Sequence, residues 1–311
     1  MLLAYPLAIK GTVFGVMVTE EELTERGIPS YHIRERRMEI VTGITQQVAL
    51  ALQNDMLQRD AIQREIFDRE LQLAKEIQTN FMPEEMPSLE GWELDARWRP
   101  ARQVGGDYYD VFELPGGCIG LVIADVADKG MPAALFMTLV RTLLRASIRD
   151  NKSPAEALHD VNELLVPDAK NGMFVTLVYG ILHPDTGHFV YANAGHVPPV
   201  LVAYGERENL FELIPSGMAL GVLQDINIEE RQLLILPGDT LVFYTDGVSE
   251  AFSPAGDMYG VNRLKQLLLS LKTSSATQVL DTILNSVSEF IASEPVADDL
   301  TIMALHREPS L

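Results

Sequence analysis

One cysteine and a shortage of basic residues are the first features of this sequence. Cys118 has no partner for an internal disulfide bond, which fits a reducing compartment. Against 44 Asp and Glu residues stand only 24 Lys and Arg, a formal net charge of −20. That balance argues against nucleic acid or an anionic membrane as a partner, because both are bound chiefly through an excess of Lys and Arg.

Long apolar runs and soft metal ligands are also missing. No apolar run reaches the roughly 18 residues that a membrane span needs. The opening stretch MLLAYPLAIK has neither a basic leader nor a cleavage site, so we do not expect a signal peptide. The six His residues show no paired metal-ligand spacing, and there is no Cys cluster for zinc. We therefore expect a globular, cytoplasmic protein that binds neither nucleic acid nor a membrane.

Two zones of different pattern precede the main domain. Residues 5–18 are predicted to form two short strands around a Lys10-Gly11 turn, too little material for a sheet that is stable alone. A long helix follows from about Ser30 and ends before Pro83, with an apolar stripe that favours pairing with a second copy as a coiled coil. Packing of the helix against its own domain is the alternative. The apolar stripe comprises Val41, Ile44, Val48, Leu52, Met56, Ile62, Ile66, Leu73, Ile77 and Phe81.

From residue 90 to 308, apolar stretches alternate with turn signals and helical patterns. Alternating residues in WELDARW predict a half-buried strand, and a hairpin with strands near 107–114 and 118–125 follows. Helices are predicted from about Pro132 to Arg149 and after Ser153, where a capping box stands. Further strands are expected in MFVTLVYGILH, HFVYANA, PPVLVAY, IEERQLLIL, DTLVFYT and LTIMALH, and further helices near 261–271 and 276–293. Hairpin-linked strands with helices inserted in pairs indicate an α+β domain with helices covering antiparallel sheet.

An Asp stands at one tip of four of the most apolar predicted strands. Asp107 begins one of them, Asp125 and Asp246 end two others, and Asp298 with Asp299 opens the last. Carboxylates that converge in a buried place repel one another and are costly unless a cation lies among them. Oxygen ligands alone suit a hard divalent cation. The alternative for each single Asp is that it caps a turn.

Six motifs carry a resemblance to a known family. They are VGGDYYD, IADVADKGMPAALFM, YANAGHVPPVL, GMALGV, LVFYTDGVSEA and DDLTIM, in the order and about the spacing of SpoIIE- and RsbU-like phosphatases. These enzymes are the bacterial branch of the metal-dependent serine/threonine protein phosphatases, the type-2C or PPM superfamily. The resemblance covers about residues 88–308. It implies an α+β fold in which helices flank an antiparallel β-sandwich, in α-β-β-α layers.

The part before this domain also resembles the family. LQLAKEIQTNFMPEEMP is similar to the segment that precedes the phosphatase domain, and residues 1–60 are similar to the closing strands and final helix of a GAF sensor domain. The resemblance therefore implies three parts. They are a truncated GAF-like remnant at 1–29, a linker helix at 30–87 and the phosphatase domain at 88–311.

The resemblance implies a site that holds two Mn²⁺ or Mg²⁺ ions. Asp107 would bind one ion, Asp125 would bridge both, and the backbone carbonyl of Val126 would complete one shell. Asp246 and Asp298 would bind on the other side. Two such ions turn a water into hydroxide at neutral pH, and its in-line attack on a phosphoserine or phosphothreonine needs no catalytic Cys.

Four further residues are candidates for contact with the substrate. Arg102 has a spacing that resembles that of the phosphate-binding arginine in the eukaryotic branch. Lys129 would attract the phosphate, with a solvated turn lysine as the alternative. His196 lies in a family motif, where it either forms packing and hydrogen bonds near the rim or acts as an acid. Gly106 would let the backbone approach the metals, with a turn role alone as the alternative. Asp128 is expected to cap the following helix, with an acid that supports the metal ligands as the alternative.

The resemblance also implies a substrate and a mode of control. Members of the branch commonly dephosphorylate a small STAS-domain anti-anti-sigma protein, and an N-terminal sensor regulates them through the linker helix. We expect residues 60–82 to dock on the domain through Ile66, Leu73, Ile77 and Phe81 and to bias the metal site. The alternatives are a catalytically silent scaffold and a phosphohydrolase of a small metabolite.

Overall fold

The computed structural model describes residues 2–20, 31–148, 152–170, 172–203, 209–271, 275–294 and 296–309. The chain divides into two compact units, Met1–Glu70 and Leu71–Leu311, and α1 (Tyr31–Thr79) belongs in part to each. The end of the long helix is therefore part of the second unit, whereas the sequence pattern starts the domain at residue 88. The expected boundary between residues 29 and 30 and the expected helix end at Arg149 lie outside the described residues.

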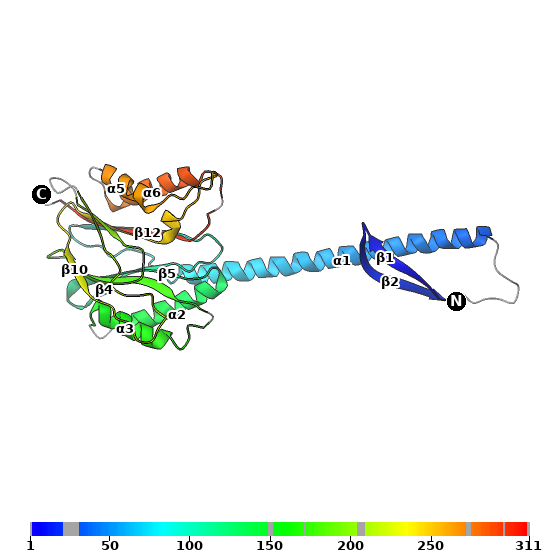
Figure 1. Cartoon of the computed structure of the whole chain (residues 1–311), viewed down its shortest axis with the longest axis horizontal. Coiled ribbons are helices and arrows are strands. Elements are labelled where there is room, and N and C mark those ends of the chain that lie inside the picture. Colours follow the sequence, from blue (N-terminus) through cyan, green and yellow to red (C-terminus); the bar gives the residue numbers. More distant parts are fainter. Residues whose placement is uncertain are drawn as a thin grey trace. The chain divides into compact units, whose positions relative to one another are not determined.

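The first unit contains a hairpin and the larger part of α1 (Figure 1). β1 (Leu2–Ile9) pairs antiparallel with β2 (Thr12–Glu20), and the turn at Lys10 and Gly11 confirms the predicted one. Both turn residues have positive φ, 47° and 88°, as a type I′ hairpin turn requires. No helix in the described part of the chain is both long and apolar enough to cross a membrane.

The apolar stripe is largely uncovered on α1. In the first unit, its side chains from Ile44 to Ile66 are between 38% and 57% exposed. Apolar side chains in such a row are stabilised when another surface covers them. The predicted pairing with a second copy would supply that surface, and it stays a prediction.

Two five-stranded antiparallel sheets form the centre of the second unit. The first has the order β10-β7-β6-β5-β4 and the second has the order β3-β12-β11-β8-β9. β11 and nearly all of β12 are buried along their length, which explains why these strands read as continuous apolar runs. The strands are β3 (Trp92–Arg99), β4 (Tyr108–Leu114), β5 (Cys118–Val126), β6 (Val175–His183), β7 (His188–Ala194), β8 (Val200–Ala203), β9 (Asn209–Glu212), β10 (Arg231–Leu234), β11 (Thr240–Tyr244) and β12 (Leu300–Arg307).

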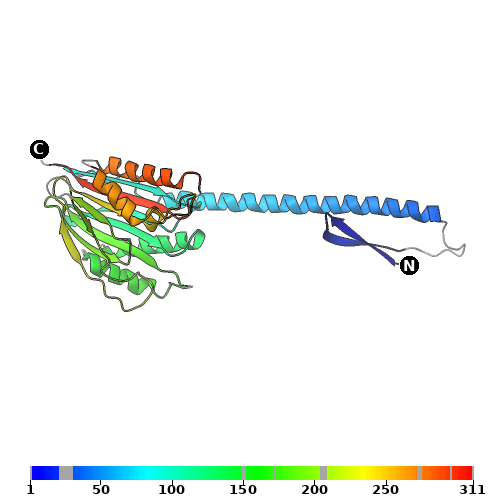
Figure 2. The same ribbon diagram turned by 45° about the horizontal axis from the view of Figure 1, so that its top comes forward.

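Helices cover the outer face of each sheet. α2 (Met131–Ser147) and α3 (Pro154–Leu165) pack on the first sheet, and α5 (Val261–Ser270) and α6 (Ala276–Ile291) pack on the second. Figures 1 and 2 show these helix pairs on opposite sides of the sheets. A further apolar cluster, built from side chains of both sheets, lies between them. These α-β-β-α layers confirm the α+β sandwich that the resemblance implies.

Local signals account for several element boundaries. Glu156 N donates to Ser153 Oγ, and Ser153 N donates to the Glu156 carboxylate, which confirms the predicted capping box of α3. The turn between β4 and β5 contains Gly116 and Gly117, whose φ angles are 79° and 74°. The sequence pattern does not predict β9 or α4 (Asp246–Ser249), because four residues are too few to show a period.

Candidate metal centre

Strand ends from both sheets carry the predicted Asp ligands. In the first sheet, Asp107 precedes β4 and Asp125 lies at the end of β5, and antiparallel pairing puts both at the same end. In the second sheet, Asp246 follows β11 and Asp298 precedes β12. Because these two strands pair antiparallel, Asp246 and Asp298 also lie at the same end. Hydrogen bonds between the sheets then bring the two pairs together.

Two hydroxyl groups join Asp107 to the second sheet. The Oγ1 atoms of Thr245 and Thr301 both donate to Asp107 Oδ2, and the Thr245 distance is 2.8 Å. Asp107 itself is buried, with 1% of it exposed. Burial, and after it the carboxylates of Asp125 and Asp299, hold the pKa of Asp107 well above its usual range, against the two hydroxyl bonds. The carboxylate therefore lies where a proton or a cation is needed to balance its charge.

Repulsion among the carboxylates extends to both sheets. Burial and the charges of Asp246 and Asp298 raise the pKa of Asp125 to about 8. Burial and Asp298 also raise the pKa of Asp246 to about 6, which the charge of Lys129 opposes. A divalent cation among these groups would relieve the repulsion, and a donor set of oxygens alone suits Mg²⁺ or Mn²⁺. The residues present therefore fit a hard divalent cation.

Asp299 holds the loop in front of Asp107. Its two carboxylate oxygens accept hydrogen bonds from Ala101 N at 2.8 Å and Gly106 N at 2.7 Å. A Cβ on Gly105 would lie 2.2 Å from Asp299 Oδ2, so the loop can come this close only with glycine there. The sequence left the role of Asp299 open, and its one signal is the doubled Asp at the start of the last strand.

The Val126 carbonyl lies beside the same loop. A Cβ on Gly106 would lie 3.0 Å from Val126 O, so the missing side chain lets the loop approach this oxygen. Val126 O accepts a hydrogen bond from Asp128 N at 2.9 Å, and a carbonyl oxygen has a second lone pair to offer. The structure thus places Gly106 and Val126 together, each next to a predicted Asp ligand in the chain.

Two cationic side chains lie at the turn between β5 and α2. Lys129 Nζ is 2.7 Å from Asp298 Oδ2 and 2.9 Å from the carbonyl oxygen of Ala297. Arg102 is exposed, and its Nη1 lies 3.6 Å from the position that a Cβ on Gly130 would take. Lys129 therefore contacts one of the predicted metal ligands directly, which the sequence does not indicate.

The expected cap at Asp128 is wrong. The N-cap residue of α2 is Gly130, and no side chain caps this helix. Asp128 Oδ1 instead accepts a hydrogen bond from Lys129 N at 2.8 Å. Gly130 has a φ of 81°, a conformation that glycine adopts without strain, so the tight entry into α2 depends on backbone freedom.

His196 is buried behind the carboxylates and connects the two sheets. Its Nε2 lies 3.1 Å from Tyr244 O on β11, and its Nδ1 lies 2.8 Å from Thr176 Oγ1 on β6. Because a carbonyl can only accept, Nε2 carries the proton and Nδ1 accepts from the Thr176 hydroxyl. Burial lowers the pKa of His196 to about 4, so the ring is neutral at pH 7. With 1% of the residue exposed, His196 is placed to position the strands rather than to meet a substrate.

Gln78 is a residue of this region that sequence reasoning missed. It lies in the last turn of α1, is buried, and its side-chain amide hydrogen-bonds the backbone of Gly105. The residues expected to dock the helix do not all do so, since Leu73 and Ile77 are 53% and 57% exposed. Phe81 does contact the domain, because Arg141 stacks on its ring at 5.1 Å and donates to its carbonyl oxygen. The apolar period of the helix gives no signal for a docking glutamine.

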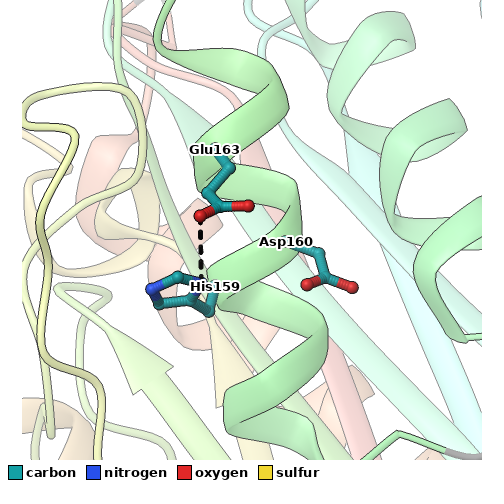
Figure 3. Close-up of side chains that lie close together, drawn as sticks. All are labelled: His159, Asp160 and Glu163. Carbon is teal, nitrogen blue, oxygen red and sulfur yellow. Dashed lines mark ion pairs between the residues drawn. The ribbon is translucent and has the colours of Figure 1, made fainter.

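Another group of potential ligands lies on α3. Among the described residues, the group of three whose ligand atoms all lie within 4.8 Å of one another is His159, Asp160 and Glu163. Figure 3 shows the His159 ring beside the carboxylate of Glu163. The distance from His159 Nδ1 to Glu163 Oε1 is 4.0 Å. Asp160 pairs with Lys152, and the side chains of His159 and Glu163 are 50% and 61% exposed. This group therefore lies on the surface of one helix, whereas Asp107 at the strand end is buried.

Known sequences resemble this chain over most of its length. The family described as Stage II sporulation protein E (SpoIIE) matches residues 115–308. Protein IcfG of Synechocystis sp. is 33% identical over 266 residues, which cover 76% of this chain but only 41% of the relative. Phosphoserine phosphatase RsbU of Bacillus subtilis is 29% identical over 240 residues, which cover 77% of this chain and 70% of the relative.

Solved structures share the fold. The SiaA-PP2C domain of Pseudomonas aeruginosa has a TM-score of 0.69 at 22% identity, covering 79% of this chain and 98% of that one. The RsbU and RsbW domains of Rv1364c from Mycobacterium tuberculosis give a TM-score of 0.60 at 28% identity, covering 73% and 63%. The second unit therefore has the fold of the PP2C phosphatase domains.

Proposed function

The chain belongs to the Stage II sporulation protein E (SpoIIE) family, and from this premise we propose that it is a metal-dependent phosphatase of phosphoserine and phosphothreonine in proteins. The observation that carries the proposal is the convergence of Asp107, Asp125, Asp246 and Asp298 at one end of the sandwich. The printed name of the relative RsbU, a phosphoserine phosphatase, supports the same activity.

The proposed cofactor is a pair of Mg²⁺ or Mn²⁺ ions. When bound, such ions supply a hydroxide nucleophile at neutral pH and neutralise charge on the phosphoryl oxygens. RsbX, a solved structure of similar fold, is described in complex with magnesium, which supports a hard cation. Asp107 and the Val126 carbonyl would hold one ion, Asp246 and Asp298 the other, and Asp125 would contact both.

The chain's own residues keep these ligands in place. Thr245 and Thr301 bind one oxygen of Asp107, which leaves its second oxygen to face the site. His196 hydrogen-bonds Thr176 on β6, which pairs with Asp125 on β5. It also hydrogen-bonds Tyr244 O on β11, the strand that ends before Asp246, so it connects the two ligand-bearing regions. Ligands fixed in this way need little rearrangement when a cation and a phosphate bind.

Contact with the phosphate is proposed for residues at the rim. The exposed guanidinium group of Arg102 lies at the β5–α2 turn and presents planar paired donors that match phosphate oxygens. Lys129, also at this turn, would add positive charge near the leaving group. Gly106 would let the backbone approach the ions. The proposed substrate is a phosphorylated STAS-type protein, on the basis of the family resemblance.

Regulation is proposed to pass through α1. The GAF-like part at the N-terminus would act on the helix, and the helix would act on the loop of Gly105 through Gln78. Two copies of the chain would pair along the apolar stripe as a homodimer. A change in this pairing would shift the loop between arrangements that bind cations well or poorly.

The experiment is release of phosphate from a phosphoserine STAS-type protein with added Mn²⁺, comparing the native chain with Asp125→Asn. Release by the native chain that requires both Mn²⁺ and Asp125 is expected. Release from nucleotides or small phosphate esters but not from the protein would favour a metabolite phosphohydrolase. Absence of any release, with Mn²⁺ bound, would favour a scaffold without turnover.

A further inference from the structure

Lys129 is already bound to a member of the carboxylate group. Among the ion pairs of the described residues, it is the one cationic side chain paired with Asp107, Asp125, Asp246 or Asp298, at 2.7 Å from Asp298 Oδ2. The carbonyl oxygen of Ala297 accepts a second hydrogen bond from the same ammonium group, at 2.9 Å. Its charge also opposes the rise in the pKa of Asp246. One ammonium group thus serves two carboxylates that the proposed function assigns to a divalent cation.

The turn that carries Lys129 is attached to the same site at its base. Asp128 accepts a hydrogen bond from the Lys129 backbone N–H, and Asp128 N donates to the Val126 carbonyl oxygen. The backbone of Lys129 is therefore held close to the carboxylates. Its side chain is 43% exposed, and a flexible four-carbon stem lets the ammonium group turn outward into water without moving the backbone.

We propose that Lys129 is a tethered competitor of the divalent cation at Asp298, an inference that rests on the proposed metal centre. While the ammonium group donates to Asp298, the same lone pair is not offered to an ion. The positive charge also repels a second cation at short distance. Cation binding then displaces Lys129 into solvent, and the affinity for the ion is lower than the carboxylates alone would produce.

The affinity for the ion then depends on the charge at position 129. Without an ion, Lys129 stabilises the carboxylate of Asp298, and once an ion is bound the ion does so. In the metal-free chain the charge of Lys129 opposes the rise in the pKa of Asp246, and a bound ion would take over that compensation of charge. Removing the ammonium group leaves the ion as the partner of Asp298.

The test is direct titration of Mn²⁺ by calorimetry into the native chain, Lys129→Met, Lys129→Gln, Lys129→Arg and Lys265→Met. Lys265 forms an ion pair with Glu212 at 2.8 Å and serves as the matched control. Lys129→Met is expected to bind at least one Mn²⁺ about fivefold more tightly, because a half-exposed ion pair contributes about that factor. Lys129→Arg, which keeps the charge, and Lys265→Met are expected to bind as the native chain does.

The outcomes separate this inference from the function on which it rests. No Mn²⁺ binding by any of the chains would overturn the metal centre and the inference together. Binding by the native chain with equal or weaker affinity in both Lys129→Met and Lys129→Gln would overturn the inference alone. Thermal unfolding without metal shows that each variant is folded, so a weaker affinity is not mistaken for loss of structure.

Discussion

The side-chain amide of Gln78 makes two hydrogen bonds with the backbone of Gly105. Nε2 donates to Gly105 O at 2.6 Å, and Gly105 N donates to Oε1 at 3.1 Å. Only 3% of Gln78 is exposed. Gly105 belongs to the loop that Asp299 holds in front of Asp107. The end of the long helix is therefore connected to the carboxylates through one glutamine and one glycine.

Replacing Gln78 by Met is expected to weaken both folding and metal binding. The variant leaves two buried backbone groups of Gly105 without partners, so the free energy of unfolding should fall by about 1–3 kcal/mol. Urea unfolding measures this loss, and Mn²⁺ titration measures the affinity. Gln72→Met is the control, because its exposed amide donates to Glu76 Oε1 within the same helix, at 3.4 Å. Equal effects of the two substitutions would contradict a special role of Gln78.

Gly105→Ala is expected to disturb the site through steric overlap. The new Cβ would lie 2.2 Å from Asp299 Oδ2, so the loop or the carboxylate has to move. We expect a loss of about 2 kcal/mol or more in stability, and weaker Mn²⁺ binding. Gly43→Ala in α1, where nothing lies within 4 Å, should instead leave binding unchanged and stabilise the helix slightly. Chemical unfolding of both variants measures the change in stability. If Gly105→Ala leaves the free energy of unfolding unchanged, the loop is free to shift.

His196→Gln is expected to change how stability depends on pH. The folded pKa of about 4 is below the ordinary 6.5, so His196 contributes its full stability above about pH 6.5 and loses it as the pH falls toward 4. At pH 5 the native chain should have lost on the order of 2 kcal/mol through this residue, a loss that the variant lacks. The stability gap between the two proteins should therefore narrow between pH 7.5 and pH 5. Urea unfolding at each pH measures the free energies of unfolding. If those of the native chain and the variant change in parallel with pH, that would argue against a buried neutral imidazole.

Asp125→Asn is expected to stabilise the metal-free chain while removing the proposed activity. Burial and like charges raise the folded pKa of Asp125 to about 8, so its charged form is unfavourable at neutral pH. The neutral amide relieves that repulsion, by on the order of 1–3 kcal/mol. Thermal unfolding in a chelator should show a higher melting temperature for the variant, and added Mn²⁺ should reverse the order. A variant that melts earlier in the chelator would speak against a repulsive carboxylate group.

Paired substitution of Ile62 and Ile66 by Lys is expected to weaken self-association. Both side chains are at least half exposed on the apolar stripe, and burying them against a second copy would stabilise a dimer. Sedimentation equilibrium measures the dissociation constant of the native chain and of the variant. Gln63→Lys, off the stripe, is the control for added charge. A native chain that stays monomeric at high concentration would remove the proposed homodimer.

Much of the fold can be predicted from local pattern. The sequence WELDARW alternates because Trp92, Leu94 and Ala96 pack into the apolar cluster between the sheets, and its strand lies where expected, at Trp92–Arg99. The capping box at Ser153 and the Gly116-Gly117 turn act within a few residues, so their effect is visible in the chain itself. The positions of Asp107, Asp125, Asp246 and Asp298 at strand ends follow from the same local information.

What the sequence by itself determined is therefore which residues end strands, begin helices and present oxygen ligands, since each depends on neighbours in the chain. Only the tertiary structure decided which of these groups meet. Asp299 binds Gly106 across 193 positions, and Gln78 reaches Gly105 across 27. The pairing of Lys129 with Asp298 likewise joins the turn after β5 of one sheet to the residues before β12 of the other. Such contacts leave no periodic trace in the sequence, because a hydrogen bond or an ion pair depends on distance in space and not on spacing along the chain.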